Sequence, residues 1–232
     1  MPEQQSSPSS TRTKRFFVRD NSLTIMAMGI FVVFLVGQSL VGHATYNADQ
    51  REHGDPTVGY VSYLGTGHFG ETVFENWESE FLQMGAYVLL TVWLRQRGSP
   101  ESKSLTDPEA VDEAPEGHAR DPGVPGPVRR GGLALWLYRN SLSTAFLVLF
   151  VLSWLAHGVT GAAEFNEEQL AHGQGQVSVV GYMSGAQFWN ESLQNWQSEF
   201  LAVGSLVILS VYLRQQGSPE SKPVHATNDE QG

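Results

Sequence analysis

Hydrophobic residues fall into four blocks along the chain, and polar stretches rich in Pro, Gly, Ser and acidic residues separate them. Two blocks are long, because residues 23–41 and 142–159 form runs of 19 and 18 residues. A helix needs about 20 apolar residues to cross a bilayer, so each long block predicts a transmembrane helix. The first block follows a basic stretch but exceeds the apolar part of a signal peptide, so we expect it to be retained.

The two remaining blocks, 81–94 and 200–213, contain 14 residues each, a length more typical of a buried helix than of a span. A half-apolar turn with a tryptophan precedes each block, and an arginine follows it. With these turns the helices extend over about 76–94 and 195–213. The whole pattern predicts an all-α membrane protein with four transmembrane helices.

The four helices belong to a sequence that occurs twice. A shift of 119 residues aligns 21–103 with 140–222 without a gap, and 34 of the 83 aligned positions are identical. We interpret this as an internal repeat whose two copies share one orientation, because each contains an even number of spans. The predicted parts are a disordered N-terminal tail (1–14), repeat 1 (15–103), a disordered Pro-rich linker (104–132), repeat 2 (133–222) and a disordered C-terminal tail (223–232).

Basic residues are distributed unevenly between the two sides of this topology. The N-terminal segment, the linker and the C-terminal segment hold 13 of the 14 Lys and Arg residues, and Arg51 alone lies in an outer loop. The positive-inside rule therefore places both termini and the linker in the cytoplasm. A net charge of −10 argues against nucleic acid as a partner. The absence of cysteine excludes disulfides and thiolate chemistry.

Two further patterns concern packing and the outer loops. Small residues recur where helices in lipid make close contacts, and four glycines occupy equivalent positions in the two copies: Gly42, Gly85, Gly161 and Gly204. The stretches 57–64 and 176–183 include Val and Tyr, so short strands remain an alternative there.

Three acidic residues line one face of the segment that leads into the second span of repeat 1. Glu71, Glu75 and Glu78 lie at helical spacing, opposite a stripe of Phe, Val and Trp. Repeat 2 carries neutral residues at the same positions, namely Asn190, Gln194 and Gln197. An acid, base or metal ligand needed in both copies would not survive that exchange, so we predict a solvated helix face.

Glu80 and Glu199 are equivalent acids that lie one residue before the two short apolar blocks. Ionisable groups at membrane depth usually face the interior of a helix bundle or an aqueous cavity. Gln38 and His157 occupy equivalent positions late in the long spans, on the same outer side. We predict a polar cluster of these four residues around the axis between the copies. It serves either as a proton relay or as interhelical hydrogen bonding.

A second motif repeats in the outer loops, where Asn, Gln and His recur at every third position and a glycine follows the histidine. This spacing places the three side chains on neighbouring positions of a helix, and the glycine supplies a left-handed helix end. Neither copy contains a His-x-x-x-His or Glu-x-x-His pair, so a structural cap is favoured over a metal site. The motif residues are Asn47, Gln50, His53, Asn166, Gln169 and His172.

One string in repeat 1 carries a resemblance to known proteins. The sequence Glu-Asn-Trp-Glu-Ser-Glu-Phe-Leu at 75–82, with Gly-Ser-Pro-Glu-Ser-Lys at 98–103, resembles a bacterial family of small membrane proteins classified as a domain of unknown function. The likeness covers both repeats, and repeat 2 departs from it at Gln194 and Gln197. Since that family has no assigned activity, the resemblance implies a bacterial inner membrane and no particular reaction or ligand.

The chain lacks the common catalytic and cofactor-binding motifs. It contains no nucleophile elbow, P-loop, dinucleotide fingerprint or zincin pair, so we expect neither an enzyme nor a cofactor nor a metal. We expect a structural or interaction protein that sits in the lipid bilayer and presents two outer loops to a protein partner or a second copy of itself. The alternative is a small proton- or ion-linked transporter or channel that uses Glu80 and Glu199.

Overall fold

A computed structural model describes residues 17–230 of the chain. Within this range the regular secondary structure is entirely helical, without strands, and the predicted all-α class is confirmed. The stretches 57–64 and 176–183, for which strands were an alternative, instead contain two short helices, α3 (Tyr60–Tyr63) and α8 (Val179–Met183). The strand alternative is therefore wrong, because each stretch closes local backbone hydrogen bonds within one helical turn.

The chain divides into two compact units, one up to Tyr63 and one from Leu64 onwards. The first unit contains α1 (Phe17–Asp20), the 32-residue helix α2 (Ser22–His53) and α3. α2 ends at Gly54, whose φ of +81° is the left-handed conformation that the sequence predicts for the glycine after the histidine. The return to α3 then places Tyr63 against α2, where it is buried.

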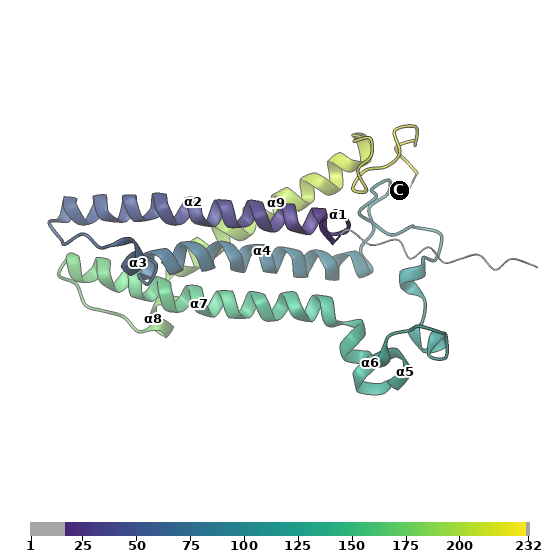
Figure 1. Ribbon diagram of the computed structural model, residues 1–232, viewed down its shortest axis with the longest axis horizontal. Coiled ribbons are helices and arrows are strands. Elements are labelled where there is room, and N and C mark those ends of the chain that lie inside the picture. The colour runs from purple at the N-terminus through teal and green to yellow at the C-terminus, as the bar shows by residue number, and fades with distance from the viewer. Residues whose placement is uncertain (1–16, 231–232) are drawn as a thin grey trace, which may run out of the picture. The chain divides into compact units, whose positions relative to one another are not determined.

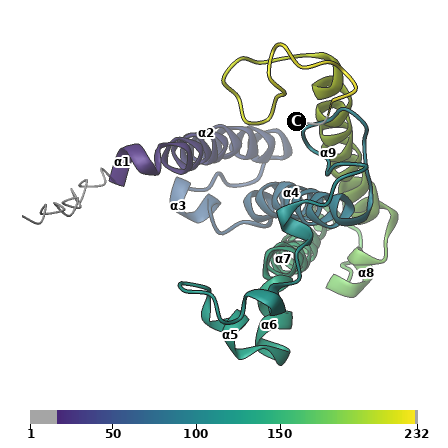
Figure 2. The same ribbon diagram turned by 90° about the vertical axis from the view of Figure 1, so that its right-hand side faces the viewer.

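The second unit is built on three long helices, α4 (Gly67–Trp93), α7 (Ser141–Ala171) and α9 (Ala186–Tyr212). α4 and α7 lie side by side, and α9 is inclined across them (Figures 1 and 2). The short helix α8 packs against α7 and α9. The second unit therefore combines one long helix from the first half of the chain with both long helices of the second half.

The segment between α4 and α7 contains short helical turns joined by irregular backbone. Its elements are the 3₁₀ helices η1 (Ala110–Asp112) and η2 (Pro115–His118) and the helices α5 (Gly126–Arg130) and α6 (Gly132–Arg139). The C-terminal segment folds back around a buried lysine, since Lys222 Nζ donates hydrogen bonds to the carbonyls of Thr227, Asn228 and Glu230. Disorder of these two segments stays a prediction.

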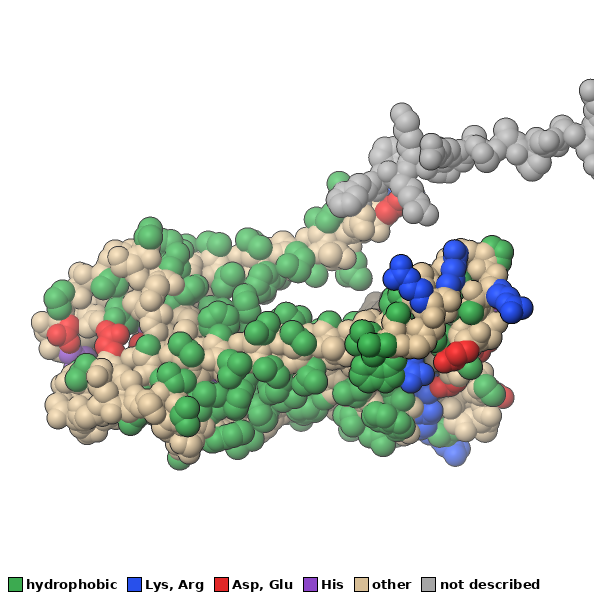
Figure 3. All heavy atoms as spheres, turned by 90° about the horizontal axis from the view of Figure 1, so that it is seen from below, with side chains coloured by type: hydrophobic (Ala, Val, Ile, Leu, Met, Phe, Trp, Pro, Cys, Tyr) green, Lys and Arg blue, Asp and Glu red, His purple; other side chains and the backbone are tan. Residues whose placement is uncertain are grey.

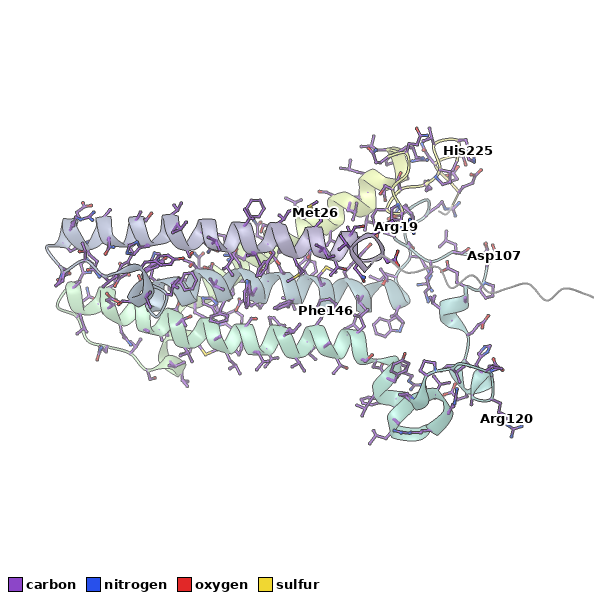
Figure 4. All side chains as sticks on the ribbon, in the orientation of Figure 1. Arg19, Met26, Asp107, Arg120, Phe146 and His225 are labelled. Carbon is purple, nitrogen blue, oxygen red and sulfur yellow. The ribbon has the colours of Figure 1, made fainter. Side chains whose placement is uncertain are left out.

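Close contacts explain three of the four glycines singled out in the sequence. A Cβ on Gly85 would lie 3.1 Å from the Cβ of Phe146, which is labelled in Figure 4 on α7. A Cβ on Gly42 or Gly161 would overlap the hydroxyl of a tyrosine from the following short helix. The expectation of a close contact is wrong for Gly204, where a Cβ would meet no atom within 4 Å.

Among the described helices, α2 and α7 are long and apolar enough to cross a membrane. The sequence predicts four spans, and this criterion supports two of them. α4 and α9 fall short because their first halves carry Glu, Asn and Gln side chains. Over the second unit, Figure 3 shows hydrophobic side chains along the middle and Lys and Arg gathered at the end that carries the linker.

Candidate functional site

A fully buried histidine marks the centre of a polar cluster in the second unit. His157 lies on α7 in an otherwise apolar stretch, and its side chain is 0% exposed. Its Nδ1 is 3.1 Å from Oε2 of Glu78, and its Nε2 is 3.5 Å from Oε2 of Glu191. Phe188 packs on the imidazole with a ring-centroid distance of 4.7 Å. The imidazole is thus held between two carboxylates from two other helices.

Glu78 reaches His157 from α4 and is also 0% exposed. Its second oxygen, Oε1, accepts a hydrogen bond from the indole Nε1 of Trp196 at 3.3 Å. Glu75, one turn earlier, accepts a hydrogen bond from the amide of Asn195 on α9. The predicted solvated face is therefore wrong for this stretch, because α9 covers it.

Tyr182 of α8 joins the remaining two carboxylates. Its hydroxyl lies 3.0 Å from Oε1 of Glu71 and 2.5 Å from Oε2 of Glu191. A tyrosine hydroxyl has one proton to donate, so it satisfies one of these oxygens at a time. Gly161 makes room for this arrangement, because a Cβ there would lie 2.6 Å from the hydroxyl and 2.9 Å from Glu71 Oε1.

The environment shifts the ionisation of the groups at the outer edge of the cluster. Burial and the charge of Glu191 raise the pKa of Glu71 to about 7. Burial and the hydrogen bond to Glu191 raise the pKa of Tyr182, so this residue stays a neutral donor. Burial opposes ionisation of Glu191, but His157 and Tyr182 outweigh it and lower the pKa of this carboxyl.

The cluster contains more acidic than basic side chains. It brings together Glu71, Glu78 and Glu191, with Glu75 beside them, around a single histidine. Among the ion pairs of the described residues, none joins these acids to Lys or Arg. Buried carboxylates are costly unless a cation, a proton or hydrogen-bond donors compensate them.

The structure brings one of the four residues of the predicted intramembrane cluster into this site. His157 is at its centre, whereas Gln38 lies on α2 in the first unit. Glu80 is exposed and Glu199 is half-buried. The two carboxyl groups are close enough to repel each other electrostatically. Gln83 links the two helices nearby through a 3.3 Å hydrogen bond to the Glu199 carbonyl. Whether Glu80 and Glu199 act together in function stays a prediction.

The motif of Asn, Gln and His makes the same contacts with the loop that follows it at both places in the chain. The Asn47 side chain accepts a hydrogen bond from the N–H of Val58 at 2.7 Å and donates one to its carbonyl at 2.9 Å. Asn166 makes the same pair of bonds with Val177, at the same two distances. The histidines of the motif bond to carbonyls of their own helices instead, His53 to Asp49 and His172 to Glu168. Gln50 and Gln169 contribute backbone carbonyls to the helix ends.

Sequence reasoning missed four members of the site: Glu71, Glu78, Tyr182 and Glu191. Three of the four have no residue of the same chemistry at the equivalent position in the other copy, so a comparison of the copies for shared groups does not select them. The informative pattern was the difference between the two copies. At the positions where the first copy has the neutral residues Gln38 and Thr72, the second has the ionisable residues His157 and Glu191.

The fold and the site define an all-helical protein with two helices able to cross a membrane and a buried carboxylate–histidine cluster in a helix bundle. The chain belongs to the family described as a domain of unknown function, DUF6766, whose model matches residues 14–232. Neither the curated proteins nor the solved structures contain a significant match to it.

Proposed function

We propose that this chain is a four-span protein of the bacterial inner membrane, built from two tandem repeats of one orientation with both termini in the cytoplasm. The apolar second halves of α4 and α9, the ungapped alignment of the two copies and the 13-to-1 distribution of basic residues support this topology. In it, the buried cluster lies near the outer surface, where α4 and α9 begin and α7 leaves its apolar stretch.

The function that the site supports best is transport of a small cation: the cluster binds the cation from the outer side, and the protein then carries it across the membrane. The observation that carries this proposal is His157, buried between Glu78 and Glu191, with no Lys or Arg among residues 17–230 forming an ion pair with these acids. Ionisable groups at this depth generally mark ion pathways or coupling sites.

Reconstitution tests this function. The full-length protein is placed in lipid vesicles that contain a pH dye or a dye for divalent cations, and flux is compared with that of Glu78→Gln and His157→Gln. We expect flux in the native protein and its loss in both variants. Glu52→Gln, which removes an exposed acid that belongs to neither cluster, is the matched control and should retain flux. Equal leakage from native protein, variants and empty vesicles would overturn the proposal.

A second candidate is an interaction protein that presents its outer loops to a partner, and one observation favours it. Val61 on α3 and Val180 on α8 occupy equivalent positions, and their side chains are 82% and 77% exposed. An exposed apolar residue retained in both copies suits contact with another protein or with a second copy of the chain. Photo-crosslinkers placed at these two positions in cells should then capture one defined product. The absence of such a product from both positions would remove this candidate.

A further inference from the structure

We propose that the cluster is a binding site for a divalent first-row transition-metal ion, with His157, Glu71 and Glu191 as its ligands. The inference rests on the proposed function, since it names the cation that the same cluster would take. The three ligands come from α7, α4 and α9, so binding would fasten the three long helices of the second unit to one another.

The distances suit one ion. One donor atom from each of the three residues lies within 4.8 Å of the other two, and the His157 Nε2 to Glu191 Oε2 distance is 3.5 Å. Donors on adjacent positions around an ion with bonds of about 2.0–2.2 Å are roughly 3–3.5 Å apart. The donors of His157 and Glu191 are therefore already at the spacing that coordination needs, and the donor of Glu71 lies within 4.8 Å of each of them.

The imidazole is prepared as a metal ligand. Glu78 holds Nδ1 at 3.1 Å, and its own second oxygen is fixed by Trp196. A carboxylate on Nδ1 keeps the proton on that nitrogen and directs the lone pair of Nε2 outwards, the arrangement that orients histidine ligands in metal sites. Nε2 is fully buried, makes no hydrogen bond and points towards the Glu191 carboxylate. A cation between Nε2 and the two carboxylates would satisfy all three groups.

Tyr182 sets the distance between the carboxylate ligands. Its hydroxyl contacts Glu71 Oε1 and Glu191 Oε2, so it keeps these two oxygens close together, and Glu191 Oε2 is the oxygen that lies 3.5 Å from Nε2 of His157. This contact depends on Gly161, which leaves the space for the hydroxyl. The site is thus supported by side chains that do not bind the ion themselves.

The donor set favours a particular class of ion. An imidazole nitrogen with two carboxylates suits Zn²⁺, Mn²⁺, Fe²⁺ or Co²⁺, whereas Mg²⁺ and Ca²⁺ prefer sites built wholly from oxygen. The chain has no cysteine, so a soft thiolate site for Cu⁺ is excluded. Three protein ligands leave one or more positions for water or for a ligand arriving from outside.

Metal titration of the purified full-length protein in detergent tests the site. Co²⁺ is followed by its visible absorption and Zn²⁺ by elemental analysis after gel filtration. We expect one ion per chain and an affinity for Zn²⁺ well above that for Mg²⁺. His157→Gln and Glu71→Asn should lower the affinity by about 100-fold or more, and Glu78→Gln by about 10–100-fold. Each substitution installs the residue that the other copy carries at the equivalent position. These residues are Gln38 for His157, Gln197 for Glu78 and Asn190 for Glu71. Because the other copy tolerates them in the same setting, we expect the variants to fold.

The control is Glu80→Gln with Glu199→Gln, which removes two acids outside the cluster and should leave binding unchanged. Elution volume and helical content of every variant are compared with those of the native protein. Less than about 0.2 ions per chain in the native protein, or equal affinity in folded His157→Gln, would overturn the metal site. If the native protein shows cation flux that the cluster variants lose, but binds no metal, the metal site is wrong and the transport function stands. If the native protein binds metal but shows no flux, the transport function is wrong and the metal site stands.

Discussion

At the scale of single residues, Glu78 and His157 show how an ionisable pair is accommodated inside an apolar bundle. Each supplies the other with a partner at 3.1 Å, and Trp196 satisfies the second carboxylate oxygen. Removing one partner of such a pair leaves the other buried and unsatisfied, which typically costs about 3–5 kcal/mol.

We therefore expect Glu78→Ala to lower the thermal unfolding temperature of the detergent-solubilised protein markedly, by an amount that corresponds to about 3 kcal/mol. Glu80→Ala, two residues away and exposed, should change it by less than about 0.5 kcal/mol. Differential scanning fluorimetry of the two variants makes the comparison. Equal shifts would mean that Glu78 is solvated in the protein.

His118 in the linker gives a prediction about pH. Hydrogen bonds with Asp121 and Glu113 raise the pKa of His118 above its usual value of 6.5. A raised pKa in the folded state means that this local contact stabilises the linker below pH 6.5 and is lost as the pH rises through the raised value. We expect the NMR titration midpoint of His118 to fall towards 6.5 in Asp121→Asn with Glu113→Gln. An unchanged midpoint would show that these contacts are absent in solution.

At the scale of elements, the start of α4 depends on a glycine that touches the backbone of α7. A Cβ on Gly67 would lie 2.5 Å from the backbone N of Glu164 and 2.9 Å from the carbonyl O of Thr160. Backbone cannot move aside as a flexible side chain can, so the two helices would have to separate. Repeat 2 has Ala186 at the equivalent position, which shows that the contact is particular to α4.

Gly67→Ala should accordingly destabilise the protein by about 1–3 kcal/mol, although alanine favours helices more than glycine does. Gly204→Ala is the matched substitution on α9, where the added methyl group meets nothing. It should be neutral or stabilise the protein by up to about 1 kcal/mol. Thermal unfolding of both variants in the same detergent decides between these signs, and a neutral Gly67→Ala would contradict the close packing of α4 on α7.

The sequence predicts several of the helices, but only some residues of the site. Hydrophobic periodicity and the glycine after the loop histidine are local signals, so the long helices and the end of α2 at Gly54 were predictable. The burial of Glu78 was not, because it depends on α9, more than a hundred residues further along the chain, covering that face. Polar residues at Glu71, Glu75 and Glu78 look solvated until their partners Tyr182, Asn195 and Trp196 are placed.

At the scale of the whole molecule, cysteine labelling tests the proposed topology directly. The chain contains no cysteine, so a single introduced cysteine reports on one position alone. In intact cells, a membrane-impermeant maleimide should label Glu52→Cys and Gln174→Cys in the outer loops. Val111→Cys in the linker should react only after the cells are opened. Labelling of both Glu52→Cys and Val111→Cys from outside would show that α4 does not cross the membrane.

The cluster draws its carboxylates from both proposed repeats, with Glu71 and Glu78 on α4 and Glu191 on α9. The equivalent positions in the other combination, Asn190, Gln197 and Thr72, carry no charge. The two halves therefore contribute different groups to the cluster. A chain made of two first halves would have the acids without the histidine, and one made of two second halves would have the histidine without Glu78. Because α4 and α7 belong to one chain, every molecule carries the acids of α4 together with the histidine of α7.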